Sequence, residues 1–472
     1  MFSPNSFVIK IIIIFTMLMS FGFGCRKRIP IESIEPVTLE YWQVWNNSFD
    51  MKTLIEKYEK ANPTIKVRFR NLRFEEYEHE MLTALAEDRG PDIFSIPHDW
   101  VGLYEESIAP APESVEIKRA ILQDPKPGEL EPTIKEVVTD RAAIINARDI
   151  KRNYYSFVKD DVLRKIESAG PDAPSSVAVK ESLMAVPLSV DTLGLYYNIS
   201  ILEKNDIYDP PQTWQRFQED VMKIAQVNED GEIVEAGAAF GTAVNLIRPT
   251  DILSALMLQT GVTMIDEERG FATFHNSIRE EDKYNIGLEA LRFYTDFADP
   301  VKKVYTWNES QEHALEAFKQ GRIAYMFGYS YNLPEIRASR VNFGVAPLPV
   351  PVGALGSATI ANYWVEAVSK KSKHQNEAWH FLNFLSQPEN LLVLQSTAGK
   401  ISPLKEQAIK ITDPELSVFA SQAPQARVWY FGKSAPDAED ALIQMIASVV
   451  NGKQSLEDAL ASGAQKVTAT LR

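Results

Sequence analysis

The chain lacks most of the residues and motifs that support catalysis or redox chemistry. Its 472 residues include a single cysteine, Cys25, so the chain cannot form an internal disulfide bond. The six histidines are scattered, and none has a second ligand at the spacing of a His-Glu-x-x-His zinc site. Gly-x-Ser-x-Gly, P-loop and dinucleotide-binding motifs are also missing. We therefore expect no catalytic residues, no metal site and no cofactor.

Positive charge is in short supply as well. The chain has 49 Lys and Arg against 64 Asp and Glu, a net charge of -15, and no basic patch that could follow a phosphate backbone. We therefore do not expect a nucleic acid as a partner. The acidic pairs Glu75-Glu76 and Glu105-Glu106 are adjacent in sequence, so on a helix their side chains point apart. We interpret them as solvated surface rather than as acid–base pairs.

The N-terminus contains the one long apolar run, residues 11–24, which is shorter than the ~20 residues needed to span a bilayer. This length is typical of a signal peptide. Cys25 follows directly, in a position that resembles the lipobox of bacterial lipoproteins, where the thiol is lipidated after cleavage. Gly24 fits that pattern, but Gly22 stands where Leu is usual, and the basic residues 26–28 oppose export. An uncleaved N-terminal anchor is the alternative interpretation.

After a tether at residues 26–37, strand-like and helix-like segments alternate. Strands show apolar residues at every second position, and helices show them three and four apart. This order predicts a parallel sheet with right-handed crossovers, as in an α/β lobe. The predicted strands are 38–45, 65–69 and 90–97, and the predicted helices are 51–61 and 77–88.

The next part, residues 109–180, is the hardest to interpret. Five prolines between positions 110 and 132 interrupt charged segments of helical pattern, and residues 170–176 are loop-like. We expect one or two helices with a surface insertion. Beyond it, residues 185–198 form a long strand-like run, and Thr213 is placed to cap a helix that begins with Trp214.

A series of motifs between residues 313 and 388 is the most specific feature of the chain. Each motif is weak alone, but the set occurs in a fixed order and spacing. It closely resembles bacterial extracellular solute-binding protein family 1, the maltose-binding-protein-like receptors of ABC importers. The motifs are Ala317–Gly321, Ala324–Met326, Phe343–Pro349, Ser369-Lys370 and Ala378–Leu385.

The resemblance implies a two-lobed periplasmic-binding-protein fold of the class II-like type. Each lobe would be a mixed sheet flanked by helices, and three hinge crossovers would join the lobes around a cleft. We expect the first hinge near residues 189–192. The N-terminal lobe would comprise residues 38–190 and 322–360, with the insertion at about 109–180. The C-terminal lobe would comprise residues 191–321 and 361–472.

The resemblance also places aromatic and polar residues at the cleft. Sugars present flat C–H faces that pack on aromatic rings, and hydroxyls that pair with carboxylates and amides. In open α/β sheets such residues follow the carboxyl ends of strands. Trp214, by contrast, we assign to packing. The candidate ligand-binding residues are Trp45, Asp99, Asp191, Trp307, Asn308, Tyr329, Tyr331, Trp364 and Trp429.

These features predict an extracytoplasmic, monomeric receptor, lipid-anchored at Cys25, that binds a carbohydrate and passes it to the transmembrane subunits of an ABC permease. A ligand-sensing or adhesion lipoprotein with the same fold is the alternative. A carbohydrate-active enzyme would need two facing carboxylates in the cleft. A non-sugar solute such as a polyol phosphate also remains open. However, Asp99, Asp191 and Glu366 near the expected cleft favour a neutral or cationic ligand.

Overall fold

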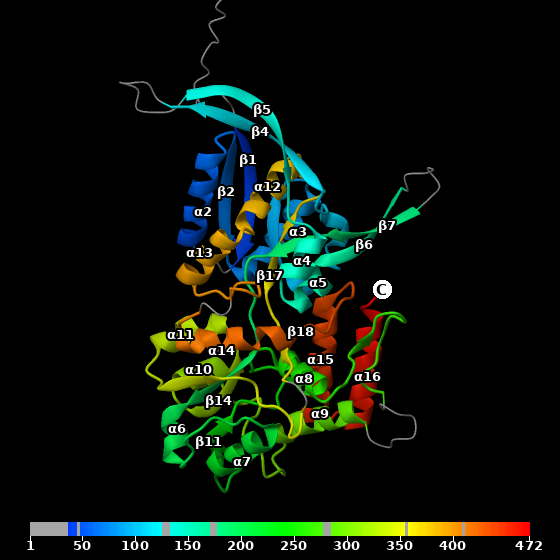
Figure 1. The fold of residues 1–472 in the computed structure, drawn as a ribbon. Helices are drawn as coiled ribbons and strands as arrows, with labels where there is room; N and C mark the ends of the chain where they lie inside the picture. Colours follow the sequence, from blue (N-terminus) through cyan, green and yellow to red (C-terminus); the bar gives the residue numbers. More distant parts are fainter. Residues whose placement is uncertain are drawn as a thin grey trace, which may run out of the picture.

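The computed structural model describes residues 36–44, 48–124, 133–169, 177–276, 285–354, 357–407 and 411–472. The elements in these ranges form two lobes, one above the other in Figure 1, each built around a five-stranded sheet. The predicted two-lobed α/β fold with mixed sheets is therefore confirmed. Within the same ranges, no helix is both long enough and apolar enough to cross a membrane.

The sheet of the first lobe has the strand order β2-β1-β3-β17-β8. Strands β1, β2 and β3 run parallel, as the sequence predicts, and β17 is antiparallel to both of its neighbours. The carboxyl end of β3 therefore lies beside the start of β17, where Trp364 pairs with Pro97. These strands span Val37–Val44 (β1), Ile65–Leu72 (β2), Ile93–Pro97 (β3), Trp364–Val368 (β17) and Ala185–Pro187 (β8).

Four amphipathic helices pack with this sheet because each buries an apolar face. In α12, Trp379, Phe381 and Leu382 are completely buried, and Phe381 meets Tyr58 of α2 edge-on, with 4.8 Å between ring centroids. The sequence therefore predicted the helical face correctly. The four helices are α2 (Ser48–Ala61), α3 (Phe74–Ala86), α12 (Gln375–Leu385) and α13 (Pro388–Ala398).

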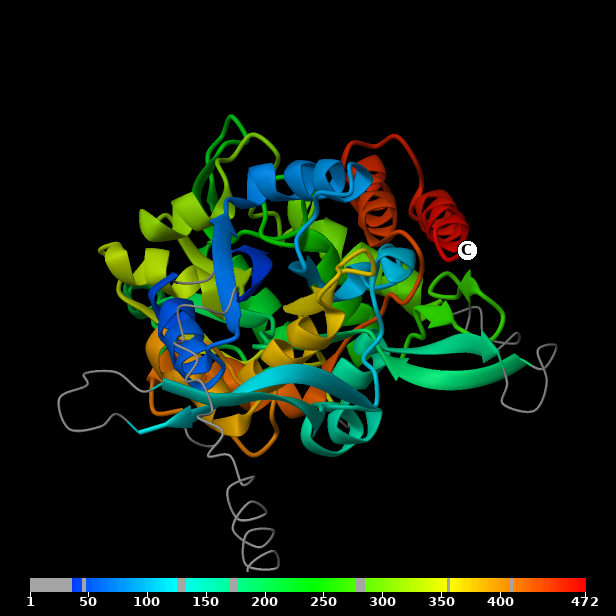
Figure 2. The ribbon, with the colours of Figure 1, turned by 90° about the horizontal axis from the view of Figure 1, so that it is seen from above.

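The prediction for residues 109–180 was mostly wrong, because two β-hairpins dominate this part. Strand β4 (Ser114–Gln123) pairs with β5 (Thr133–Ala143), and β6 (Leu163–Ala169) pairs with β7 (Val177–Leu183). At the start of β4, the buried residues Val115 and Ile117 alternate with more exposed neighbours, and this period of two is lost farther along the strand. Only the short helices α4 (Ala147–Asn153) and α5 (Ser156–Val162) lie between the hairpins. Figure 2 shows both hairpins reaching out from the body.

The second lobe has the strand order β10-β11-β14-β9-β15. Helices surround this sheet in Figure 1. Thr213 caps α7 as predicted, since its Oγ1 accepts a hydrogen bond from Arg216 N at 3.2 Å, and Trp214 is buried. The strands are β9 (Gly194–Asn198), β10 (Gln226–Val227), β11 (Ile233–Ala238), β14 (Ile323–Gly328) and β15 (Phe343–Ala346). The helices are α6 (Ile199–Lys204), α7 (Trp214–Ile224), α8 (Pro249–Gln259), α9 (Ile286–Thr295), α10 (Ala314–Lys319), α11 (Leu333–Ala338), α14 (Pro414–Gln422), α15 (Ala435–Val450) and α16 (Leu456–Ala469).

Two strands lie in the opposite lobe from the one expected. Strand β14 pairs with β9 and β11 in the second sheet, so residues 322–360 do not return to the first lobe. Strand β17 pairs with β3 and β8 in the first sheet, so the chain re-enters the first lobe after residue 361. The sheet that a strand joins is set by its pairing with strands distant in sequence. The local pattern of β14 and β17, two short apolar runs, therefore does not reveal which sheet each one joins.

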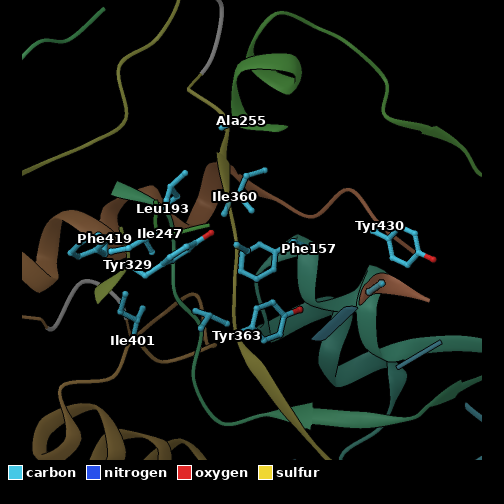
Figure 3. Close-up of a cluster of buried hydrophobic side chains, with 14 of the residues drawn as sticks. Phe157, Leu193, Ile247, Ala255, Tyr329, Ile360, Tyr363, Ile401, Phe419 and Tyr430 are labelled. Carbon is cyan, nitrogen blue, oxygen red and sulfur yellow. The ribbon is translucent and has the colours of Figure 1, made fainter. Parts of the chain in front are cut away.

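The chain crosses between the lobes three times, and the three crossing segments lie together. They run between β8 and β9, between β15 and β17, and between α13 and α14. Val190 N donates a hydrogen bond to Ile401 O, and Leu193 N donates one to Ile360 O, both at 2.9 Å. Figure 3 shows Leu193, Ile360 and Ile401 at this junction, beside Tyr363. The predicted hinge at residues 189–192 lies in the first crossing segment.

Candidate functional site

A small cavity of about 20 Å³ lies where the two lobes meet. The first lobe contributes His98 and Asp99 from the single turn η2 (His98–Trp100), which follows the carboxyl end of β3. The remaining lining residues come from the second lobe and from the crossing segment before β17. They are Arg248, Thr250, Asp251, Ile360, Ala361, Val428, Trp429, Tyr430, Ala435 and Glu439.

Arg248 organises the second-lobe wall of this cavity. Its Nε donates a hydrogen bond to Asp251 Oδ2 at 2.8 Å, and its Nη1 lies 2.9 Å from the Glu439 carboxylate. Tyr329 Oη donates to the same Asp251 oxygen at 2.7 Å. Burial disfavours a charged guanidinium, but Asp251 and Glu439 outweigh it and raise the pKa of Arg248. The guanidinium is therefore already occupied by two carboxylates.

A second group of polar side chains supports the first-lobe wall. His98 Nδ1 lies 3.0 Å from Asp161 Oδ2, and the His98 ring stacks on Tyr363 with 4.5 Å between centroids. The Tyr363 hydroxyl donates a hydrogen bond to the same Asp161 oxygen. Burial favours neutral imidazole, but the Asp161 carboxylate outweighs it and raises the pKa of His98. His98 is thus held in place by Asp161 and Tyr363.

Asp99 differs from the other carboxylates of the site. It is half-buried and lines the cavity, and no described residue donates a hydrogen bond to its side chain. Burial raises the pKa of Asp99, while the nearby His98 and Arg248 act in the opposite direction. Asp99 is therefore a partly desolvated acceptor that faces the cavity with its hydrogen-bonding capacity unused.

The hinge carries a carboxylate of its own, Asp191. Ser330 Oγ donates to Asp191 Oδ2 at 2.7 Å, and the backbone N–H groups of Ser330 and Tyr331 also donate to this side chain. Burial raises the pKa of Asp191 to about 6, although the hydrogen bonds from Ser330 and Thr192 partly counteract that rise. Asp191 thus ties the first crossing segment to the turn that follows β14.

Five of the nine predicted residues lie at the cavity or at the hinge beside it. Asp99 and Trp429 line the cavity directly, and Tyr329 contacts it through Asp251. Tyr331 is 48% exposed, and its ring stacks on Tyr329 with 5.4 Å between centroids. Together with Asp191 they surround the point where the crossing segments meet. Their role in binding stays a prediction.

The other four predicted residues lie elsewhere. Trp307 is 1% exposed in the hydrophobic core, and the side chain of Asn308 is bound locally to Tyr305 and Ser310. Neither residue lines the cavity. Trp364 is the first residue of β17, an inner strand of the first sheet, and its ring is edge-on to Phe74 with 6.1 Å between ring centroids. Trp45, like Cys25, lies outside the described residues.

Sequence reasoning missed four charged residues of the site, Asp161, Arg248, Asp251 and Glu439. Arg248 directly precedes Pro249, the first residue of α8, which is a recognisable helix start. Asp161 and Glu439 lie within the ordinary helices α5 and α15, and nothing local sets them apart.

The chemistry of the site suits the binding of a polar ligand. Carboxylates, hydroxyls and the Trp429 ring converge from both lobes, as in sites that recognise hydroxylated or charged solutes. Within the described ranges, no group of three or more His, Cys, Asp or Glu residues could hold a metal ion. A cavity of about 20 Å³ has room for one water-sized group, so a larger solute can enter only when the lobes separate.

Comparison with known proteins agrees with this geometry. A sequence model of the family described as bacterial extracellular solute-binding protein matches residues 50–391. A maltotriose-binding protein of Pyrococcus abyssi is 23% identical over 403 residues, which cover 83% of this chain and 69% of that protein.

Solved structures with the same fold include two sugar-binding proteins. The cyclic alpha-maltosyl-1,6-maltose binding protein of Arthrobacter globiformis has a TM-score of 0.66 at 18% identity, with 92% of this chain and 99% of that chain covered. The sugar-binding protein MalE of Xanthomonas citri also has a TM-score of 0.66 at 18% identity, with 92% and 97% covered. At this level of identity the likeness establishes the two-lobed fold.

Proposed function

Because this chain belongs to the bacterial extracellular solute-binding protein family, we propose that it captures a carbohydrate between its lobes and delivers it to an ABC importer. The family is one of binding proteins, and the fold is the two-lobed one that its structural neighbours share. The observation that carries the proposal is the cavity at the lobe interface, to which both lobes contribute polar side chains.

The carbohydrate part of the proposal is supported by relatives. The Pyrococcus abyssi relative is a maltotriose-binding protein, and the Arthrobacter globiformis structure is that of a maltose-derived saccharide receptor. In this chain, Trp429 and Tyr430 offer ring surface next to the carboxylates of Asp99 and Glu439. Such a combination suits a sugar, which has both apolar C–H faces and hydroxyl donors.

The proposed motion is hinge closure. Three adjacent crossing segments act as the hinge, and both walls of the cavity would separate when the lobes open. A solute that contacts both walls stabilises the closed state, because it binds that state more tightly than the open one. Delivery to permease subunits would then depend on the closed form.

The proposal includes export and anchoring at the outer face of the cytoplasmic membrane. An extracytoplasmic location agrees with the family, whose members are described as extracellular. The lipidation site, Cys25, and the apolar run before it lie outside the described residues. Metabolic labelling with a fatty acid tests this part. Wild type should incorporate label and Cys25→Ser should not, and label retained in the variant would contradict lipidation at Cys25.

Ligand binding can be tested with a thermal-shift titration of the full-length protein against maltodextrins of two to seven glucose units. We expect a saturable rise in melting temperature, since a ligand that binds only the native state stabilises it by mass action. Trp429→Ala should abolish the rise. Tyr208→Ala, at a ring 78% exposed outside the cavity, is the matched control. A rise that persists in Trp429→Ala would contradict binding at this cavity.

Transport can be separated from sensing by measuring uptake. A strain lacking the gene should lose uptake of the labelled saccharide that the binding assay identifies, and the wild-type gene should restore it. Undiminished uptake in the deletion strain, with binding intact in vitro, would favour the ligand-sensing lipoprotein instead.

A further inference from the structure

Negative charge exceeds positive charge around the interlobe cavity. Two carboxylates, Asp99 and Asp161, belong to the first lobe, and two, Asp251 and Glu439, belong to the second. Arg248 and His98 are the cationic partners of this group. With all six groups charged, four carboxylates against two cations leave an excess of two negative charges in a partly buried space. Such an excess is unfavourable, and it is relieved when a carboxylate takes up a proton or when a cationic ligand joins the group.

The two cations are already committed to particular carboxylates. Arg248 contacts Asp251 and Glu439, and His98 contacts Asp161. Asp99 is the carboxylate left over, and no described residue donates a hydrogen bond to it. An anionic solute would find only the shared Arg248 to bind and would meet four carboxylates. The site therefore disfavours the binding of phosphates and other anions.

The other cavity wall near Asp99 is aromatic. Trp429 lines the same cavity, as does Tyr430, and the face of such a ring attracts a cation. An ammonium group is about the size of a water molecule, and the cavity volume of about 20 Å³ matches one such group. A primary ammonium group therefore suits this cavity, which offers it the free carboxylate of Asp99, the ring of Trp429 and a space of matching size.

We propose that the solute captured by this protein carries a protonated amine, which donates hydrogen bonds to Asp99 while Trp429 packs beside it. This inference rests on the proposed binding function and narrows its ligand class to amine-bearing saccharides. The saccharide frame would enter with the lobes apart, and closure would place the ammonium group between η2 and the start of α15.

Isothermal titration of the full-length protein with two matched ligands tests the inference. Glucosamine oligosaccharides and N-acetylglucosamine oligosaccharides of equal length share one backbone. They differ at nitrogen, which is a protonated amine in the first series and a neutral acetamide in the second. We expect the amine form to bind about 10- to 100-fold more tightly, since a charge-assisted hydrogen bond is lost with the acetylated form. Asp99→Asn should reduce this preference to within a few-fold.

Asp140→Asn is the matched control, because Asp140 pairs with Arg119 on the β4–β5 hairpin, outside the cavity. This variant should keep the full preference. Maltodextrins and spermidine complete the panel as a neutral saccharide and a non-saccharide amine. Tighter binding of a neutral saccharide than of the glucosamine series would overturn the charge inference and uphold the proposed function. If spermidine binds and no saccharide does, the charge inference is upheld and the proposed function, capture of a carbohydrate, is overturned. A preference for glucosamine that survives Asp99→Asn would overturn the role of Asp99.

Discussion

Ser330 Oγ donates a hydrogen bond of 2.7 Å to the carboxylate of Asp191 and so joins two segments that are 139 residues apart. Asp191 lies in the first crossing between the lobes, and Ser330 begins the turn after β14. The same carboxylate also accepts from backbone N–H groups, so it serves as the acceptor around which the hinge is ordered. The predicted site residues Asp191 and Tyr331 owe their proximity to this contact.

Replacing Asp191 with Asn should weaken the hinge. One carboxylate oxygen becomes an amide that cannot accept from Ser330 or Tyr331, so buried donors lose their acceptor. We expect a loss of about 1–3 kcal/mol in the free energy of unfolding, measured by urea denaturation. Ser330→Ala removes only one of these hydrogen bonds and should cost less. An Asp191→Asn protein as stable as wild type would contradict the structural role assigned to this side chain.

Arg248→Met should destabilise the cavity wall, because Asp251 and Glu439 would lose their shared cation. Breaking a fully buried ion pair costs about 3–5 kcal/mol. Arg248 and Glu439 are 30% and 31% exposed, so solvent reduces the expected loss to about 2–3 kcal/mol. The control is Arg119→Met at a single exposed pair with Asp140, where we expect less than about 1 kcal/mol. Equal losses in the two variants, measured by chemical denaturation, would argue against the buried network.

Tyr329→Phe removes one hydroxyl and leaves the ring in place. Tyr329 is completely buried and its hydroxyl donates to Asp251, so we expect a loss of about 1–2 kcal/mol in unfolding free energy. Tyr331→Phe serves as the matched control, since Tyr331 is 48% exposed and should change stability by less than about 0.5 kcal/mol. Thermal and urea unfolding of the pair would show the difference, and its absence would count against the Tyr329–Asp251 bond.

Glu366 should make stability depend on pH. Its carboxylate lies within the first sheet, where it accepts hydrogen bonds from Gln43 Nε2 at 2.8 Å and Ser95 Oγ at 2.6 Å, and burial raises its pKa to about 7. The folded state therefore binds a proton more tightly than the unfolded state, whose carboxyl has an ordinary pKa near ~4.3. Stability from this group is complete below the unfolded pKa and is lost as pH rises through about 7.

Glu366→Gln isolates this effect, because glutamine has nearly the same shape and no charge. Relative to wild type, the variant should become more stable as pH rises from 5 to 8, by on the order of 1–3 kcal/mol. Urea denaturation at several pH values measures the trend. Asn376→Glu, which places a carboxylate at an exposed position at the start of α12, should show no such trend. Parallel pH profiles for wild type and Glu366→Gln would contradict a raised pKa in the folded state.

Local sequence pattern predicted part of the fold correctly. Strands and helices alternate between residues 37 and 97, and this order follows from contacts within a few residues. The same holds for the cap at Thr213 and for the buried face of α12. The hairpins β4–β5 and β6–β7 were missed because β4 shows period-two alternation only over its first residues. The charges in the strands and the prolines around them led to an interpretation as interrupted helices.

The candidate site was only partly predictable for the same reason. Asp99 could be chosen because it follows a strand of a parallel sheet, and Trp429 because aromatic rings pack on the C–H faces of sugars. Arg248 and Glu439, which complete the cavity wall, are 191 residues apart and become partners only through the packing of α8 against α15. No local signal distinguishes them from surface charges.

By itself, the sequence determined the class of the fold, the acidity of the chain and the order of motifs typical of solute-binding receptors, since each depends on composition or on neighbours along the chain. Only the tertiary structure decided which lobe each strand joins and which charges face the cavity. Strand pairing and ion pairing are contacts between distant segments, and their free energy depends on burial and geometry that exist only once the two lobes have folded.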